Sequence, residues 1–270
     1  ENAATTTAVK ETTGMKLYYQ GELAENYYYS TSCGYGTDTG IWKSENEPIS
    51  YIRPGKLASE ETRQNAQSAE DMSAEENFAA YIRTVDENDF ESGEPWYRWQ
   101  YEVNEIDIDG LLGRVQERYQ ANAALIQTRK EGADGAYYVS EPVEDIGELQ
   151  NIEISKRGPG GIADEMLITG SEAVIKVISE YNIRRILCDG ESKVIRQNGS
   201  GSVPGTLLPS AFFIIETGNV EEDMVGYTLI GGGYGHGVGM SQNGAKEMGS
   251  LGYGYEEILT SFFADCEIKM

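Results

Sequence analysis

The sequence is poor in the residues that build disulfide scaffolds and metal sites. Its 270 residues include three cysteines and a single histidine, His236. Cys33, Cys188 and Cys266 are too few and too far apart for a disulfide framework, and no C-x-x-C motif occurs. One histidine and three distant thiols also lack the spacing of a metal site. We therefore expect three small apolar cysteines, and neither a metal ion nor another cofactor.

Basic residues are also scarce, and long apolar runs are absent. The chain has 21 Lys and Arg against 45 Asp and Glu, a formal net charge of −24. This charge keeps an exposed protein soluble and repels polyanions, so nucleic acids and anionic membrane surfaces are poor partners. No run of about 18 apolar residues, the length that crosses a bilayer, occurs. The chain opens at Glu1 without a signal peptide, and we expect it to be an internal piece of a longer protein.

The sequence instead contains many short strand patterns. β-Branched segments bounded by Gly, Pro or polar turns fill much of residues 151–233. Helical spacing marks residues 107–130, with Asp109 as a plausible N-cap, and residues 255–263 near the end. Helices and strands do not alternate regularly. This order predicts an α+β fold with a β-rich mixed core of short strands and a few scattered helices.

The domain organisation follows from the same pattern. Residues 15–40 are interpreted as a hairpin that leads into a small-residue loop. Residues 55–93 are rich in acidic and small residues, and we interpret them as a partly helical, solvated insertion without a function of its own. No internal repeat occurs, so we expect one domain over residues 1–270 that lacks its N-terminal part.

The single histidine lies in the most glycine-rich stretch, GGGYGHGVGMSQNGA, residues 231–245. Three common loop motifs do not match this stretch. The glycine spacing of a dinucleotide loop is missing, Ala245 stands where a P-loop needs lysine, and Ser241 lacks the second glycine of a nucleophile elbow. The stretch joins the end of a strand to the start of a helix. Ser241 or Asn243 is the expected N-cap of that helix.

Glycines at positions 233, 235, 237 and 239 allow positive φ and a close approach of a ligand. We expect His236 to be partly exposed, with Ser241, Gln242 and free backbone N–H groups nearby. These donors suit a sugar or another polar, neutral ligand. The alternative is that a lone histidine in a glycine loop only hydrogen-bonds its own turn, and the residues alone leave both interpretations open.

Residues 236–245, HGVGMSQNGA, closely resemble the signature of the SpoIID/LytB family of stage II sporulation protein D and amidase-enhancer proteins. Further similar blocks follow one another in the family's order: AVKETTGMKLYYQGELAENYYYSTSCGYGTD, ISYIRP, EPWYRWQYEV, ISKRGPGGIADEMLITG and YNIRRIL. The chain departs from the family at Asn243, where a tyrosine is usual, and at Tyr29, where many members have histidine. The resemblance covers nearly the whole chain, apart from the acidic insertion and residues near 130–145.

The resemblance implies a role on peptidoglycan in the cell envelope, outside the cytoplasmic membrane, with a membrane-anchored or secreted parent. Sporulation members are lytic transglycosylases that cleave peptide-free glycan strands to 1,6-anhydro products during engulfment, beside an amidase and a second hydrolase. Their catalytic glutamate lies upstream of the block that begins here at Ala8, so we expect the general acid outside this chain. Glu165 belongs to a strand block and does not take that role. The alternatives are a non-catalytic, peptidoglycan-binding amidase enhancer and a purely structural wall protein.

The resemblance also implies candidate site residues. Supporting catalytic roles fall to His236, Ser241 and Gln242, which would bind the sugar or orient the missing carboxylate. The expected substrate-binding residues come from two polar loops: Ser30, Ser32, Gly34, Tyr35, Tyr234, Gly235, Gly237 and Gly239. The rings of Tyr35 and Tyr234 are expected to stack on sugars.

Overall fold

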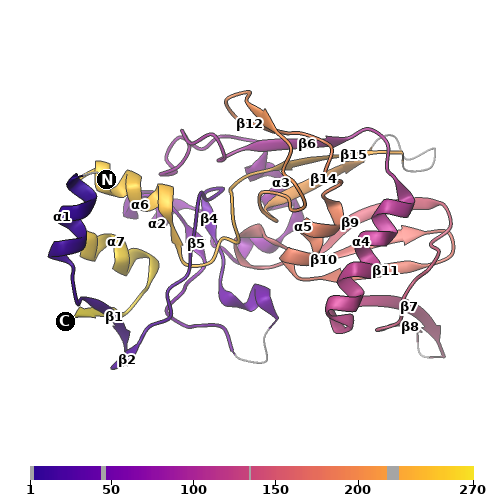
Figure 1. The fold of residues 1–270 in the computed structure, drawn as a ribbon, viewed down its shortest axis with the longest axis horizontal. Coiled ribbons are helices and arrows are strands. Elements are labelled where there is room, and N and C mark those ends of the chain that lie inside the picture. Colours follow the sequence, from indigo (N-terminus) through magenta and orange to yellow (C-terminus); the bar gives the residue numbers. More distant parts are fainter. Residues whose placement is uncertain (1–2, 44–46, 134, 218–224) are drawn as a thin grey trace.

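The computed structural model describes residues 3–43, 47–133, 135–217 and 225–270. Its helices are α1 (Ala3–Glu11), α2 (Glu60–Asn65), α3 (Glu75–Ile82), α4 (Ile108–Ala121), α5 (Glu180–Leu187), α6 (Gln242–Ser250) and α7 (Tyr255–Phe262). Short 3-10 turns are η1 (Thr39–Trp42), η2 (Asp71–Ser73), η3 (Ala123–Leu125) and η4 (Pro159–Gly161). Figure 1 shows the helices scattered around several sheets.

Two five-stranded antiparallel sheets form the larger part of the molecule. One has the strand order β8-β7-β11-β10-β9, and the other β13-β12-β6-β15-β14. The first contains β7 (Ile126–Gly132), β8 (Gly135–Val139), β9 (Leu149–Arg157), β10 (Ala163–Gly170) and β11 (Val174–Ile178). The second contains β6 (Trp99–Val103), β12 (Val194–Arg196), β13 (Gly201–Ser202), β14 (Phe213–Thr217) and β15 (Tyr227–Gly231). The predicted α+β class with short strands and scattered helices is confirmed.

Alternating burial explains why these segments form sheets with one buried face. In β6, Trp99, Tyr101 and Val103 are buried while the residues between them are exposed. Helix α5 packs against β10 and β11 of the other sheet. Helix α4 packs on α5, and its N-cap is Asp107, whose side chain accepts from Gly110 N–H, so the expectation of Asp109 is wrong by two residues.

A smaller sheet lies at the other end of the molecule, where both ends of the described chain are also found (Figure 1). Its order is β17-β1-β2, with β1 (Lys16–Tyr19), β2 (Glu22–Leu23) and β17 (Cys266–Lys269). The turn between β1 and β2 places Gln20 and Gly21 at positive φ, which confirms the predicted hairpin. Two further pairs join distant segments: β3 (Tyr28–Tyr29) with β16 (Met240–Ser241), and β4 (Tyr35–Gly36) with β5 (Gly55–Lys56).

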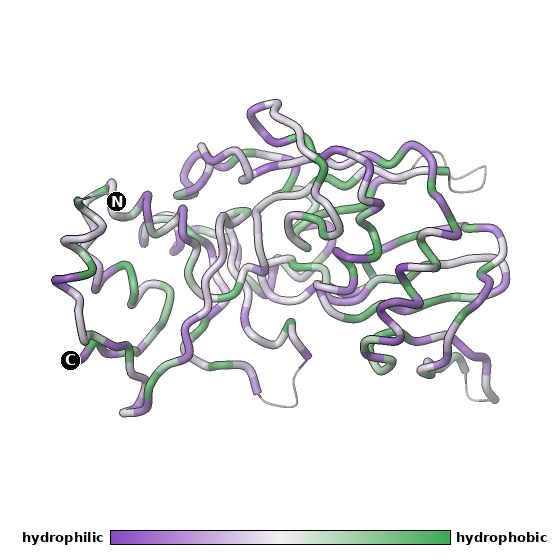
Figure 2. Tube along the Cα trace, in the orientation of Figure 1, coloured by the Kyte–Doolittle hydropathy of each residue, from purple (hydrophilic) through white to green (hydrophobic). Residues whose placement is uncertain are grey.

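Residues 55–93 are not solvated throughout, because part of this insertion belongs to the core. The segment is partly helical, as expected, but Met72, Phe78 and Ile82 are fully buried in the core. The Phe78 ring lies against Gly161 and beneath the guanidinium of Arg157. The expectation of a solvated segment is therefore wrong at these positions. Figure 2 shows the corresponding mixture of polar and apolar residues along the tube.

The three cysteines are free and buried, as the sequence predicts for small apolar residues. Burial raises the pKa of Cys33 to about 11, which keeps its thiol protonated at neutral pH. Within the described ranges, every helix is too short or too polar to cross a membrane. The same residues contain no cluster of three His, Cys, Asp or Glu side chains placed to hold a metal ion.

Candidate functional site

Two loops that are distant in the sequence interlock at the centre of the candidate site. We call residues 27–37 the serine loop and residues 231–243 the glycine loop. Strand β3 of the serine loop pairs in parallel with β16 of the glycine loop. Further along, Tyr234 N–H donates to the Thr31 carbonyl at 2.7 Å, and Thr31 N–H donates back to the Tyr234 carbonyl at 3.2 Å. The two predicted polar loops therefore form one unit.

The alternating glycines make this interlocking possible. Positive φ angles occur at Gly233, Gly235, Gly237 and Gly239, with values of 82°, 119°, 79° and 75°. A Cβ on Gly235 would lie 2.6 Å from the Cβ of Tyr29, and one on Gly237 would lie 2.6 Å from the Phe212 ring. The predicted positive φ is confirmed. The close approach is made by the serine loop and the core, which fill the space beside these glycines.

His236 is half-buried and holds its own loop together. Its Nδ1 accepts from Val238 N–H at 3.1 Å, and the centre of its ring lies 5.8 Å from that of Tyr29 and 5.6 Å from that of Trp42. Burial lowers the pKa of His236, the charge of Arg184 lowers it further, and a hydrogen bond with the Tyr28 backbone opposes both. The imidazole is therefore neutral at pH 7. Of the two interpretations left open by the sequence, the hydrogen bond to its own turn is present.

Ser241 and Ser32 meet at a buried carboxylate, Glu91. The Glu91 Oε1 atom accepts from Ser241 Oγ at 2.6 Å and from Ser32 N–H at 3.0 Å. Ser241 Oγ also accepts from Gly244 N–H at 3.3 Å, so it is the N-cap of α6. Each serine belongs to a different loop, and Glu91 therefore ties the serine loop to the glycine loop.

The other oxygen of Glu91 has no hydrogen-bond partner among the residues that the structure describes. Only 1% of Glu91 is exposed, and Oε2 points toward Gly244, where a Cβ would lie 3.0 Å away. Burial raises the pKa of Glu91 to about 7, the charge of Glu94 adds to this, and hydrogen bonds with Ser241 and Ser32 oppose it. Sequence reasoning missed Glu91 because it lies at the end of the acidic segment, outside any motif.

Two of the expected sugar-binding residues, Gly34 and Tyr35, are buried beneath the interlocked loops. The Tyr35 side chain is in the core, and its hydroxyl donates to the Gln67 carbonyl at 2.9 Å. Gly34, at a φ of 106°, is packed against Tyr81 and Asp89. Burial leaves the Tyr35 ring no surface to offer a sugar, so the expected stacking role does not fit its position.

A network of buried polar groups from residues 56–98 holds the backbone of the serine loop in place. Asp89 accepts from Tyr97 Oη at 2.7 Å and pairs with Lys56 Nζ at 2.7 Å. Arg98 donates to the carbonyl of Cys33 at 2.8 Å, and Tyr81 Oη donates to the same carbonyl at 3.0 Å. The backbone beside Ser32 is therefore fixed by groups from the 55–98 region.

The accessible part of the site is a strip that we call the loop surface: Ser30, Trp96, Tyr234, Gln242 and Asn243. Tyr234 is exposed, and its ring lies 4.7 Å from that of Trp96. Asn243 N–H donates to the Ser30 carbonyl at 3.0 Å, and Gln242 is exposed at the first turn of α6. The structure thus brings three of the expected residues together at the surface, while it buries Ser32, Ser241 and Gly237.

The fold and this site define an α+β domain organised around two interlocked loops. The family described as Domain of unknown function (DUF8618) matches residues 37–239, which is most of the chain, so the chain belongs to that family. The chain is also similar to the Amidase enhancer of Bacillus subtilis (strain 168), with 23% identity over 264 residues. That alignment covers 97% of this chain and 32% of the relative, so the chain spans about a third of the relative's length. The resemblance seen in the sequence is thereby supported as a distant relationship.

Proposed function

We propose that this chain is a non-catalytic, peptidoglycan-binding domain of a cell-envelope protein that assists a cell-wall amidase. The loop surface carries the proposal, because it combines an exposed aromatic pair with hydroxyl and amide groups on a rigid backbone. The similarity to a protein named Amidase enhancer supports the amidase as partner.

The chemistry of the loop surface suits a neutral glycan. Sugar rings offer an apolar face that packs on aromatic rings and hydroxyl groups that pair with amides. Tyr234 is held in place by Trp96, whose other neighbour is the guanidinium of Arg196 at 4.7 Å. Ser30 and Gln242 supply hydrogen-bonding groups beside it. A prearranged set of this kind binds without a large entropic cost.

The burial of Glu91 supports binding without cleavage. A general acid must come within hydrogen-bonding distance of the glycosidic oxygen that it protonates. Glu91 is the carboxylate held between the loops, and it is sealed in by Ser241, Ser32 and the first turn of α6. His236 also uses Nδ1 inside its own turn. Both groups act on the loops and keep the glycan-facing backbone in place.

A lytic transglycosylase that forms 1,6-anhydro products is the second candidate. A pKa of about 7 at Glu91 is a property of general acids, and it favours this candidate. The reaction would require the two loops to separate so that Glu91 reaches the glycan. A sporulation role in engulfment, beside an amidase and a second hydrolase, would accompany this activity.

Co-sedimentation with purified peptidoglycan sacculi tests the proposal. We expect the chain to sediment with sacculi and to raise the rate at which a purified N-acetylmuramoyl-alanine amidase releases stem peptides. Tyr234→Ala should weaken binding about tenfold, because it removes the exposed ring. The matched control is Tyr137→Ala on β8, since Tyr137 is 51% exposed and Tyr234 is 44% exposed.

Each outcome has a defined meaning. Binding that falls for Tyr234→Ala and not for Tyr137→Ala supports the loop surface. Equal binding by both variants, or none by the parent chain, contradicts it. Binding without an effect on the amidase rate would remove the amidase from the proposal and leave a glycan-binding domain.

A further inference from the structure

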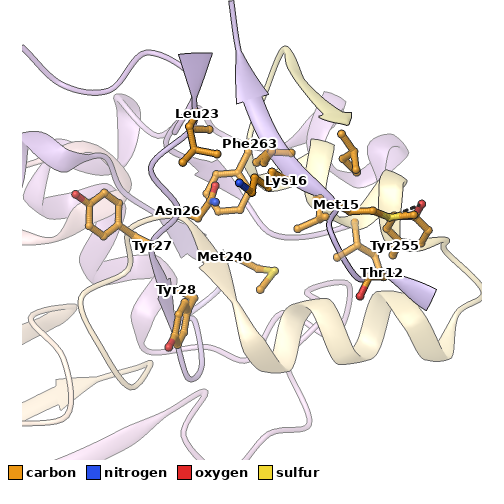
Figure 3. A pocket seen from close by; sticks show the side chains of 15 residues that line it. Thr12, Met15, Lys16, Leu23, Asn26, Tyr27, Tyr28, Met240, Tyr255 and Phe263 are labelled. Atoms are coloured by element: carbon orange, nitrogen blue, oxygen red, sulfur yellow. Dashed lines mark hydrogen bonds between the residues drawn. The ribbon is translucent and has the colours of Figure 1, made fainter. Parts of the chain in front are cut away.

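A second surface, distinct from the loop surface, lies at the end of the molecule that holds both termini. It is a groove of about 660 Å³ between the β1–β2 hairpin, the segment after α1, and α7. Figure 3 shows Leu23 on one side, Met15 and Tyr255 on the other, and Phe263 between them. Tyr28 and Met240, from the paired strands β3 and β16, form the wall nearest the loops.

The lining of the groove is mostly apolar, and some of its side chains are exposed to solvent. Apart from Thr12, Lys16 and Asn26, its residues are aliphatic, aromatic or methionine. Leu23 and Tyr28 are among the most exposed large hydrophobic side chains of the described residues. A contiguous apolar surface of this kind marks an interaction site more often than scattered exposed residues do.

The groove is built from the two end regions of the described chain. All of its lining residues come from residues 12–28 and 240–268, whereas the family match covers residues 37–239. The strands of the two five-stranded sheets lie within that match, whereas Ser32 and Ser241 of the two loops lie outside it. The groove therefore lies outside the segment that the family model matches.

Negative charge surrounds the apolar lining. Exposed glutamates neighbour the lining residues on three elements: Glu11 at the end of α1, Glu22 and Glu25 around β2, and Glu256 and Glu257 on α7. Lys16 is the one cationic residue among those that line the groove. The whole chain carries a formal charge of −24. An occupant with apolar anchors and positive flanks is thus favoured by both contacts and long-range attraction.

We propose that this groove binds a short amphipathic helix of a protein partner, with an apolar face toward Leu23 and Phe263 and lysines or arginines on the polar face. The groove runs beside α7, so the interaction belongs to the helix-in-groove class, in which anchors recur every three or four residues. Because Tyr28 and Met240 join the groove to the interlocked loops, a partner docked here lies next to the loop surface.

The probe is a fluorescently labelled peptide of about 18 residues, five helical turns, with leucines on one face and lysines on the other. We expect it to bind the chain, and Leu23→Glu to weaken that binding at least tenfold. The matched control is Leu251→Glu, which adds the same charge at a side chain that is 59% exposed, against 61% for Leu23. A scrambled peptide of equal composition, without an apolar face, controls for simple charge attraction.

Three results would overturn the proposal. The first is that Leu23→Glu and Leu251→Glu weaken peptide binding equally. The second is that the scrambled peptide, or a peptide with glutamate in place of lysine, binds as well as the amphipathic lysine peptide. The third is dimerisation of the chain that Leu23→Glu abolishes, seen by size-exclusion chromatography with light scattering, because the occupant is then a second copy. Leu23→Glu should leave sacculus binding unchanged and Tyr234→Ala should leave peptide binding unchanged, so the two proposals fail separately.

Discussion

The interlocked loops and the apolar groove are neighbours with opposite construction. In the loops, several polar groups are buried and paired: Ser241 and Ser32 with Glu91, and His236 with its own turn. In the groove, apolar side chains such as Leu23 and Tyr28 are exposed. The loops are therefore strongly determined by their own packing, whereas the groove has surface available for another molecule. Substitutions should affect stability in the first region and binding in the second.

The largest effect is expected from Gly239→Ala. Gly239 has a φ of 75°, and a Cβ there would collide with the carbonyl oxygen of Tyr27. Backbone strain and overpacking together should lower the free energy of unfolding by about 4 kcal/mol. Gly252→Ala is the control, because Gly252 has a φ of 93° but open space around it, and it should lose only about 1 kcal/mol. Urea denaturation measures both, and equal losses would show that the loops are not tightly packed.

The next effect is a pH dependence that originates at Glu91. Folding raises its pKa from 4.5 to about 7, so its contribution to stability is complete below pH 4.5 and is lost as the pH rises through 7. Glu91→Gln stays neutral, and its stability relative to the parent should therefore increase between pH 4.5 and 8, by on the order of 3 kcal/mol. Denaturant titrations across this range measure the difference. Glu102→Gln on the exposed face of β6 should show no such trend.

A smaller loss of stability is expected from His236→Ala. The substitution leaves the buried Val238 N–H without its acceptor, which should cost about 2 kcal/mol of the free energy of unfolding. At a temperature where the variant stays folded, its sacculus affinity should be close to that of the parent chain. A loss of affinity without a loss of stability would instead indicate that the imidazole contacts the glycan directly.

The smallest effect is expected in the groove. Leu23→Glu should change the free energy of unfolding by less than about 0.5 kcal/mol, because the side chain is already exposed. Thermal and urea denaturation check this. A large loss would mean that Leu23 packs against the chain itself, and the contrast between the two regions would then disappear.

The sequence predicts the fold and the glycine loop well for physical reasons. Alternating burial and β-branched residues determine strands such as β10 and β11, and the glycines around His236 allow the positive φ that the loop adopts. Glu91 could not be predicted, because a buried carboxylate in an acidic segment has no local pattern. Its burial depends on Ser32 and Ser241, which come from opposite ends of the chain.

The groove could not be predicted from the sequence either, for a related reason. Its apolar residues are those that would be expected to form a core, and periodicity cannot tell which of them lack neighbours. The same limit applies to Tyr35 and Tyr234, both tyrosines beside glycine, of which one is buried and the other exposed. Only the packing of distant segments distinguishes them.

Mass spectrometry of peptide-free glycan strands incubated with this chain tests the central claim most directly. The account predicts that the strands bind the chain, in a manner weakened by Tyr234→Ala, and are recovered without new 1,6-anhydro ends. New 1,6-anhydro ends that disappear in Glu91→Gln would contradict it, because Glu91 would then act on the glycan as a general acid.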